Sequence, residues 1–181
     1  MTEHSVSIRS SGKPTRRRVM AGVAMAVGSL AAGGARAQTQ TKMTEEMSSG
    51  VEGLLTYLHQ EIEIRARRER IYAVLLDAKQ FAAFTGEPAE INREVGGAFS
   101  LFGARIVGRN VELVPNQRIV QAWRPAAWDP GLYTLVRFEL QDQGATTRVV
   151  LDHTGFPEGN YRHFSFGWYE HYWDPLRKFL T

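Results

Sequence analysis

From residue 54 onward, hydrophobic and polar residues recur first with the period of a strand and then with that of a helix. Ile62 and Ile64 alternate with charged neighbours in the segment Leu58–Arg65, which predicts a half-buried strand. Apolar residues then recur at helical spacing, first in Arg67–Leu76 and next in Lys79–Phe84. The globular part is therefore expected to open with one strand and two short helices.

Short apolar segments separated by Gly, Pro and Asn fill the middle of the chain, a spacing that is typical of an antiparallel meander. They are Glu90–Glu94, Ala98–Phe102, Arg105–Val114, Arg118–Arg124, Tyr133–Gln141 and Thr146–His153. A last helix is predicted over Asn160–Leu180, with a kink or restart at Asp174-Pro175 because proline cannot continue a helix ladder. We predict an α+β domain in which a curved antiparallel sheet of about six to seven strands surrounds this long helix.

The first 37 residues have the pattern of an export signal. Arg16 and Arg17 directly precede a weakly apolar segment, and Ala35 and Ala37 supply the small residues that a signal peptidase accepts. The arrangement resembles a bacterial twin-arginine signal, with cleavage after Ala37. We predict a periplasmic or secreted protein with no stable membrane span after cleavage. An uncleaved membrane anchor and a wrongly assigned start codon are the alternatives.

The chain is expected to consist of a signal peptide (1–37), a flexible polar linker (38–53) with one helical turn near Met43–Met47, and one domain (54–181). The whole chain carries 22 basic and 19 acidic residues. Six of the basic residues and one acidic residue lie in the first 37, so the remainder has a net charge near −2 and no nucleic-acid footprint. The absence of cysteine excludes disulfides, thiolate metal sites and cysteine nucleophiles.

Five short segments of the domain resemble one known family. They are Phe84-Thr85-Gly86, Gly96-Gly97-Ala98-Phe99, Val111–Pro115, Ile119–Arg124 and Gly167-Trp168-Tyr169. On these residues the chain resembles the activators of the ninety-kilodalton heat-shock protein ATPase, a family of the SRPBCC superfamily, which also holds START lipid-transfer domains, polyketide cyclases and the Bet v 1 allergens. The resemblance extends from Leu58 to Leu180. It implies a helix-grip fold, in which the sheet and the long helix enclose an apolar cavity.

Aromatic residues are concentrated in the last predicted helix. One stripe at helical spacing should face the sheet, either as plain core packing or as the wall of a ligand cavity: Phe164, Trp168, Tyr172, Leu176 and Phe179. Phe166, Tyr169 and Trp173 lie off this stripe. They predict a partly exposed aromatic ridge through which a homodimer would form.

Candidate residues for the cavity wall occupy the apolar faces of the predicted strands and of the last helix. They are Ile64, Phe99, Val107, Val136, Phe138, Val149, Leu151, Phe164 and Trp168. His153 and His171 are predicted to point toward the same space, either as polar handles for a ligand or as hydrogen-bonded core or rim histidines.

Side chains for other chemistry are sparse. His163, Glu170 and Asp174 share another face of the last helix, where solvated polarity competes with metal ligation, and no fourth ligand follows from the sequence. We therefore predict no metal site. No Gly-x-Ser-x-Gly elbow and no Gly-x-Gly-x-x-Gly motif after a strand is present, so neither a catalytic residue nor a cofactor is predicted.

The function predicted from these features is that of an exported binding module for a small hydrophobic or amphipathic ligand. Two alternatives remain open. The first is a co-chaperone-type activator, as the resemblance implies, although the leader conflicts with a cytosolic heat-shock partner. The second is an enzyme of the cyclase or hydrolase type, which requires a buried carboxylate or histidine with a shifted pKa in the cavity.

Overall fold

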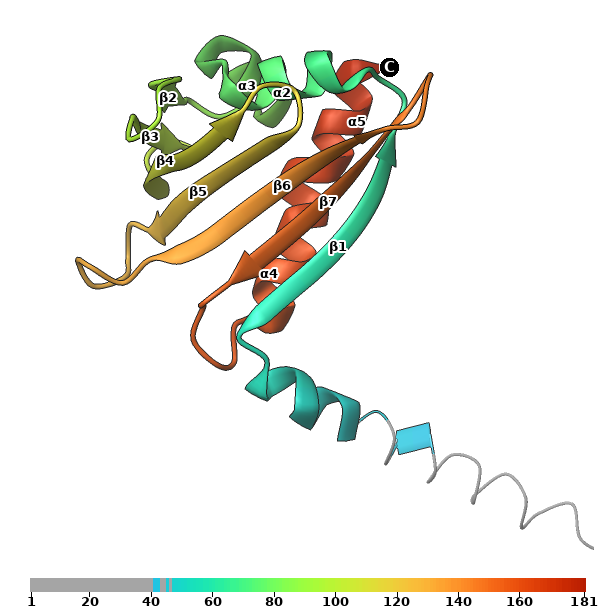
Figure 1. Cartoon of the computed structure of the whole chain (residues 1–181). Coiled ribbons are helices and arrows are strands. Elements are labelled where there is room, and N and C mark those ends of the chain that lie inside the picture. The colour runs from blue at the N-terminus through green and yellow to red at the C-terminus, as the bar shows by residue number, and fades with distance from the viewer. Residues whose placement is uncertain (1–40, 43–44, 46) are drawn as a thin grey trace, which may run out of the picture. The chain divides into compact units, whose positions relative to one another are not determined.

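Seven antiparallel strands form one curved sheet in the order β1-β7-β6-β5-β4-β3-β2 (Figure 1). The computed structural model describes residues 41–42, 45 and 47–181. The strands are β1 (Tyr57–Ile64), β2 (Glu90–Ile91), β3 (Ala98–Leu101), β4 (Ile106–Val114), β5 (Arg118–Pro125), β6 (Thr134–Asp142) and β7 (Thr147–Thr154). Strands β2 to β7 follow one another as a meander, and β1 completes the sheet beside β7.

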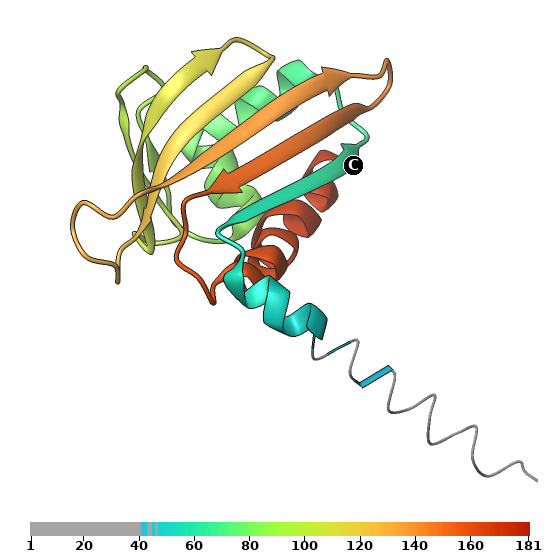
Figure 2. The same ribbon diagram turned by 60° about the horizontal axis from the view of Figure 1, so that its bottom comes forward.

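The helices lie on the concave side of the sheet and at one end of it (Figures 1 and 2). They are α2 (Arg68–Leu76), α3 (Ala78–Thr85), α4 (Tyr161–Trp168), the π-helix η1 (Tyr169–Trp173) and α5 (Asp174–Leu180). The last three form the long C-terminal helix, around which the sheet curves. The predicted α+β helix-grip fold is thereby confirmed.

The two short helices lie where the sequence predicts them, although α2 begins one residue later and α3 is one residue longer at each end. The Asp77 carboxylate accepts a hydrogen bond from the Gln80 backbone N–H and so caps the start of α3 (3.0 Å). Gly86 ends the same helix in the left-handed region, with φ of 73° and its N–H donated to the Ala82 carbonyl. Strand β1 starts one residue earlier than predicted, and its even-numbered residues are buried.

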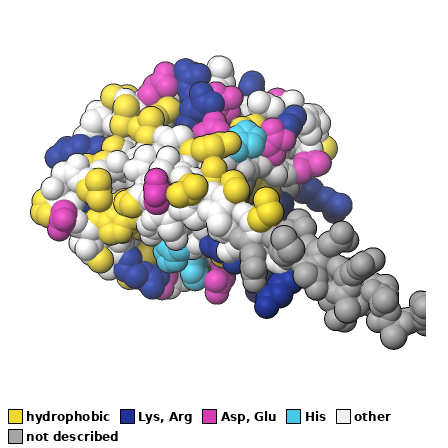
Figure 3. Space-filling view, turned by 90° about the horizontal axis from the view of Figure 1, so that it is seen from below, with side chains coloured by type: hydrophobic (Ala, Val, Ile, Leu, Met, Phe, Trp, Pro, Cys, Tyr) yellow, Lys and Arg dark blue, Asp and Glu magenta, His cyan; other side chains and the backbone are white. Residues whose placement is uncertain are grey.

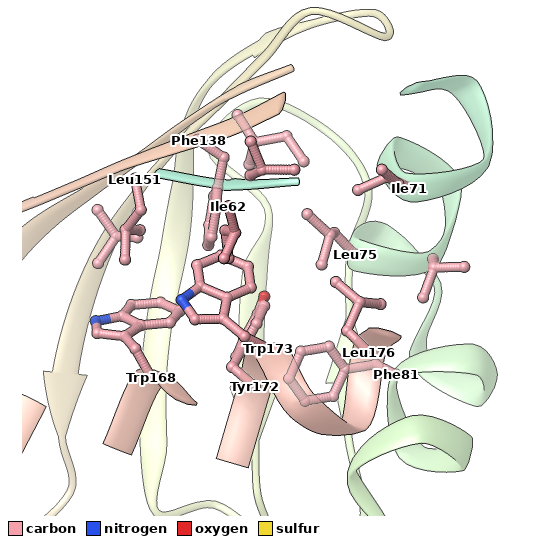
Figure 4. Packing of buried hydrophobic residues seen from close by; sticks show 14 of the residues in the cluster. Ile62, Ile71, Leu75, Phe81, Phe138, Leu151, Trp168, Tyr172, Trp173 and Leu176 are labelled. Carbon is pink, nitrogen blue, oxygen red and sulfur yellow. The ribbon is translucent and has the colours of Figure 1, made fainter. Parts of the chain in front are cut away.

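The core is formed where the C-terminal helix packs against the sheet and against α2 and α3. Trp168, Tyr172 and Leu176 are buried and project from the helix toward the strands (Figure 4). They meet buried side chains of the sheet and of the two short helices, among them Ile62, Ile71, Leu75, Phe81, Phe138 and Leu151. The predicted inward stripe of the last helix is therefore present.

The π-helical turn changes which aromatic residues face inward. The Asp174 N–H bonds to the Tyr169 carbonyl five residues earlier, which replaces the usual four-residue repeat. Trp173 consequently stacks under Trp168, with ring centroids 5.5 Å apart, and is 0% exposed. The prediction of an exposed Trp173 is wrong. Phe166, which is 70% exposed, and Tyr169 lie at the surface as expected.

Charged side chains form a chain of contacts across the outer face of the sheet. Asp152 on β7 contacts His59 Nδ1 on β1 and Arg137 Nη2 on β6, each over 2.7 Å. Arg148 pairs with Glu61 beside them. Basic and acidic groups are also interspersed on the face shown in Figure 3, with no continuous basic patch there.

The segment before β1 differs from the flexible polar linker that the sequence predicts. Residues 47–54 are helical, while part of the predicted turn at Met43–Met47 lies outside the described residues. Glu52 pairs with Arg162 over 2.8 Å, and the Gly159 N–H donates to the Gly53 carbonyl over 2.8 Å. These contacts hold the end of the segment against the start of α4. The predicted export signal lies outside the described residues, among which no helix is long and apolar enough to cross a membrane.

Candidate functional site

A cavity of about 300 Å³ lies between the sheet and the first half of the C-terminal helix. Strands β5 and β7 and the loop between β3 and β4 form one side, and α4 and η1 form the other. Its lining residues are Phe102, Arg105, Ile106, Trp123, Pro125, His153, His163, Phe164, Gly167, Trp168, His171 and Tyr172. Most of this surface is aromatic, which suits a flat apolar molecule.

His153 is the most deeply buried polar residue of the cavity wall. Its Nδ1 accepts a hydrogen bond from the Trp168 indole N–H (3.2 Å), so the proton resides on Nε2, which donates to the Thr134 hydroxyl (2.8 Å). Thr134 in turn donates to the Trp123 carbonyl (3.3 Å). Burial lowers the pKa of His153 to about 3, which keeps the ring neutral.

The same hydrogen bonds argue against His153 as the general base that an enzyme of the cyclase or hydrolase type would need. A shifted histidine is present, as that alternative requires, but its one basic lone pair is engaged by Trp168. A general base needs a lone pair within reach of the substrate proton, so His153 fits a structural role. Among residues 41–42, 45 and 47–181, no cluster of His, Cys, Asp or Glu is arranged to hold a metal ion.

Tyr172 carries a polar group for which the domain provides no partner. The side chain is 3% exposed, and burial raises the pKa of Tyr172 well above its ordinary value. Its hydroxyl makes no hydrogen bond within the part of the chain that the structure describes. Only Arg124 Nε is a fully buried side-chain polar atom without a partner in that part, so the Tyr172 hydroxyl retains some accessible surface, and Tyr172 is one of the residues that line the cavity.

The other two buried indoles are tied by hydrogen bonds to the sheet. Trp123 donates to Gln121 (2.9 Å), whose amide donates to Asn110 on the next strand (2.9 Å). Trp173 donates to Gln60 (2.8 Å). Because these polar groups are satisfied, they fix the aromatic walls in place without offering donors to a ligand.

The side chains at the mouth of the cavity are basic or imidazole groups. The Arg105 side chain is 65% exposed and that of His171 is 61% exposed, and His163 is exposed as well. Arg105 Nη2 donates to Glu87 (2.8 Å), and its Nε donates to the Phe102 carbonyl (3.1 Å). The cavity thus combines an aromatic interior with a mouth lined by one arginine, which pairs with Glu87, and two histidines.

Four of the residues predicted for the cavity line it: Phe164, Trp168, His153 and His171. Six others are buried in the packed core away from it, namely Ile64, Phe99, Val136, Phe138, Val149 and Leu151. The prediction for Val107 is wrong. It lies opposite Ser100 on the outer face of β4, because Ile106 and Gly108 are the residues that pair with the buried Leu101 and Phe99.

The remaining lining residues were missed as cavity residues, although Tyr172 belonged to the predicted inward stripe. Trp123 had a usable signal, since it shares a strand face with the apolar Ile119. Gly167 had no such signal, because a glycine in the sequence does not indicate whether the space beside it is filled or empty in the folded protein. A Cβ built on Gly167 meets nothing within 4 Å, so this position opens directly onto the cavity.

Comparison with known proteins identifies the family. The family described as "Activator of Hsp90 ATPase homolog 1-like protein" matches residues 65–181, well over half of the chain. The chain belongs to this family. The membership confirms the resemblance and, together with the helix-grip architecture, assigns the domain to the SRPBCC superfamily.

Two curated relatives from eukaryotes are named as activators of the 90 kDa heat shock protein ATPase. The human activator of 90 kDa heat shock protein ATPase homolog 1 is 26% identical over 110 residues, which cover 61% of this chain and 32% of that protein. The Dictyostelium discoideum homologue is 32% identical over 107 residues, covering 59% of this chain and 28% of that protein. This chain therefore spans about a third of the length of the curated relatives it matches.

Solved structures share the fold. An HSP90 activator from Plasmodium falciparum superposes with a TM-score of 0.60 at 24% identity, covering 64% of this chain and 89% of that one. An Aha1 dimer from Colwellia psychrerythraea superposes with a TM-score of 0.59 at 20% identity, covering 70% of this chain and 96% of that one.

Proposed function

We propose that the domain binds a small, largely apolar molecule in the cavity between the sheet and α4, without changing it chemically. The observation that carries the proposal is the aromatic cavity of about 300 Å³, whose lining includes Tyr172, a residue with no hydroxyl partner among the described residues. A volume of this size is at the lower end of the range that small-molecule sites occupy. A buried hydroxyl without a partner costs about 1–3 kcal/mol, so a ligand oxygen or nitrogen that reaches it gains specificity.

The walls favour a planar ligand. Trp123 and Trp168 lie 5.1 Å apart between ring centroids, and Trp168 and Tyr172 lie 4.8 Å apart. Each ring is fixed by packing or by a hydrogen bond, so binding requires little ordering of the protein. The lack of an available base on His153 supports binding over catalysis.

A neutral fluorescent probe tests this function. N-phenyl-1-naphthylamine is expected to bind the full chain at one saturable site, with its emission rising as the probe leaves water. Gly167→Leu places a branched side chain in the cavity and is expected to abolish saturable binding. Phe166→Leu, one residue earlier on the exposed face, serves as the matched control and should bind as the wild type does. Absence of saturable binding to the wild-type chain would overturn the proposal.

We also propose that the protein works after export through a twin-arginine-type signal, on the evidence of Arg16, Arg17, Ala35 and Ala37. N-terminal sequencing of the protein from fractionated cells tests this. A periplasmic or secreted form beginning at Gln38 is expected. A form that begins at Met1 and resides in the cytosol would contradict it.

Activation of a heat-shock ATPase is the second candidate function, and family membership over residues 65–181 favours it. The proteins that carry this name, such as the human relative, are about three times as long as the matched region. The test is the ATP hydrolysis rate of a bacterial ninety-kilodalton heat-shock protein with and without this chain. A saturable increase supports the role, and an unchanged rate excludes it for that partner.

A homodimer through the exposed Phe166 and Tyr169 is proposed as the state in solution, with Trp173 removed from the predicted interface. The structurally similar Colwellia psychrerythraea protein is described as a dimer, which supports the proposal. Sedimentation equilibrium is expected to give twice the chain mass for the wild type and a monomer for Phe166→Glu. A monomeric wild type would refute it.

A further inference from the structure

The polar groups of the cavity are arranged by depth, and none of them is acidic. His153 and Tyr172 lie inside, whereas Arg105, His163 and His171 lie at the mouth. No Asp or Glu is among the twelve residues that line the cavity. A ligand with one negatively charged end can therefore meet the Arg105 guanidinium at the mouth and aromatic rings further in.

The loop that carries Arg105 has an unusual backbone. Phe102, Gly103 and Ala104 have φ angles of 54°, 63° and 69°, so three consecutive residues adopt the left-handed region, two of them without being glycine. Such residues cost of order 1–3 kcal/mol each and persist where the surrounding structure requires them. This turn places the Phe102 ring 5.3 Å from Phe81 and sets Arg105 at the mouth.

Two hydrogen bonds orient Arg105 and leave part of its guanidinium available. Nε donates to the carbonyl of Phe102, and Nη2 donates to Glu87. Its other N–H groups make no hydrogen bond within residues 41–42, 45 and 47–181. Glu87, which is itself outside the cavity lining, balances the charge of Arg105 when no anion is bound.

We propose that the cavity selects aromatic carboxylic acids, with the ring system against the cavity faces of Trp123 and Trp168 and the carboxylate on Arg105. This inference rests on the proposed binding function and specifies its ligand class. A single guanidinium matches a single carboxylate, to which it donates two parallel hydrogen bonds. The Tyr172 hydroxyl then selects for one hydroxyl or carbonyl on the buried part of the ligand.

The test compares an acid with its neutral isostere. The probes 2-naphthoic acid and 2-naphthamide have the same ring body, and each is titrated against the full chain preloaded with N-phenyl-1-naphthylamine. The acid is expected to displace the probe at a concentration lower by about tenfold than the amide. Arg105→Gln is expected to remove this difference by weakening only the acid. Arg109→Gln removes an exposed arginine on the outer face of β4, the strand that follows the Arg105 loop, and should leave both competitors unchanged.

The outcomes separate the two proposals. Equal displacement by acid and amide in the wild type would overturn the acid selectivity while leaving apolar binding intact. Loss of the acid's advantage in Arg109→Gln as well as in Arg105→Gln would also overturn it, because the effect would then reflect net charge. Failure of the naphthylamine itself to bind would overturn the binding function and this inference with it.

Discussion

Trp168 donates its indole N–H to Nδ1 of His153 over 3.2 Å, and this one bond decides the chemistry of the cavity wall. It fixes the tautomer of the imidazole, because the proton must then reside on Nε2, where Thr134 accepts it. It also joins the C-terminal helix to β7 at the point where the sheet curves around it. Of the two interpretations that the sequence leaves open for His153, a polar handle for a ligand or a hydrogen-bonded core histidine, these bonds fit the second.

The burial of His153 predicts how the free energy of unfolding changes as the pH falls. The folded protein holds the pKa of His153 at about 3, whereas the unfolded chain has the ordinary value near 6.5, so between these values only the unfolded chain is protonated. This contribution to the free energy of unfolding is complete above about pH 6.5 and falls on acidification, by up to about 1.4 kcal/mol per pH unit. Urea denaturation from pH 7 to pH 4 measures it.

Variants isolate this contribution from that of the carboxylates. His153→Gln, although less stable at pH 7, is expected to lose less stability than the wild type between pH 7 and pH 4. His171→Gln, which changes an exposed histidine, is measured beside it as the control for replacing an imidazole by an amide. Parallel slopes in His153→Gln and the wild type would show that the burial of His153 does not depress its pKa.

The π-helical turn predicts very different losses of stability for substitutions at two aromatic residues seven positions apart. Trp173→Ala empties a fully buried site and breaks the bond to Gln60, so the free energy of unfolding should fall by about 3–5 kcal/mol. Phe166→Ala removes a surface ring and should change it by less than about 0.5 kcal/mol in the monomer. Denaturation of both variants at low protein concentration provides the comparison, and equal losses would contradict the π-helical register.

Two glycines are predicted to respond oppositely to alanine. A Cβ on Gly108 would collide with the Ala122 carbonyl and with the Phe99 ring, so Gly108→Ala should cost about 1–3 kcal/mol of stability. A Cβ on Gly167 meets nothing, so Gly167→Ala should stabilise the helix by about 0.5–1 kcal/mol. Urea midpoints of the two variants decide the matter. A stable Gly108→Ala protein would mean that Phe99 does not cover this position.

The chain of charges on the outer sheet face predicts a titration shift. The hydrogen bond that the His59 ring donates to the Asp152 carboxylate raises the pKa of His59 above its ordinary value. The resulting stabilisation is present below about pH 6.5 and is lost as the pH rises through the raised pKa. Proton NMR of the His59 ring follows this titration directly. In Asp152→Asn the pKa should move back toward 6.5, and an identical midpoint in both proteins would rule out the contact in solution.

The strands and short helices followed from local pattern because their inward residues are apolar and their ends carry recognisable turn chemistry. Strand β1 alternates without interruption, and Gly86 ends α3 as glycine caps usually do. The same reasoning gave the wrong inward face for strand β4. Its inward positions include Gly108 and Asn110, which look polar or empty in sequence, so the apolar Val107 was assigned to the wrong face.

The cavity itself was only partly predictable. Whether inward residues such as Ile64 and Phe138 fill the interior or line a space depends on how the sheet curves, which no local pattern records. The π-helical turn likewise could not be predicted from local sequence pattern. A constant 100° step along the last helix places Trp173 outside, and only the i to i+5 bond of Tyr169 with Asp174 brings it in.

Native mass spectrometry gives the most direct test of the central claim that the cavity holds a small molecule. The full chain and its Gly167→Leu variant are purified from fractionated cells, incubated with the same lipid and metabolite extract, and measured side by side. We predict one bound molecule per wild-type chain, and an unliganded Gly167→Leu variant of equal or greater stability. A wild-type chain that remains unliganded in every extract, or a Gly167→Leu variant that retains the same bound mass, would contradict the account.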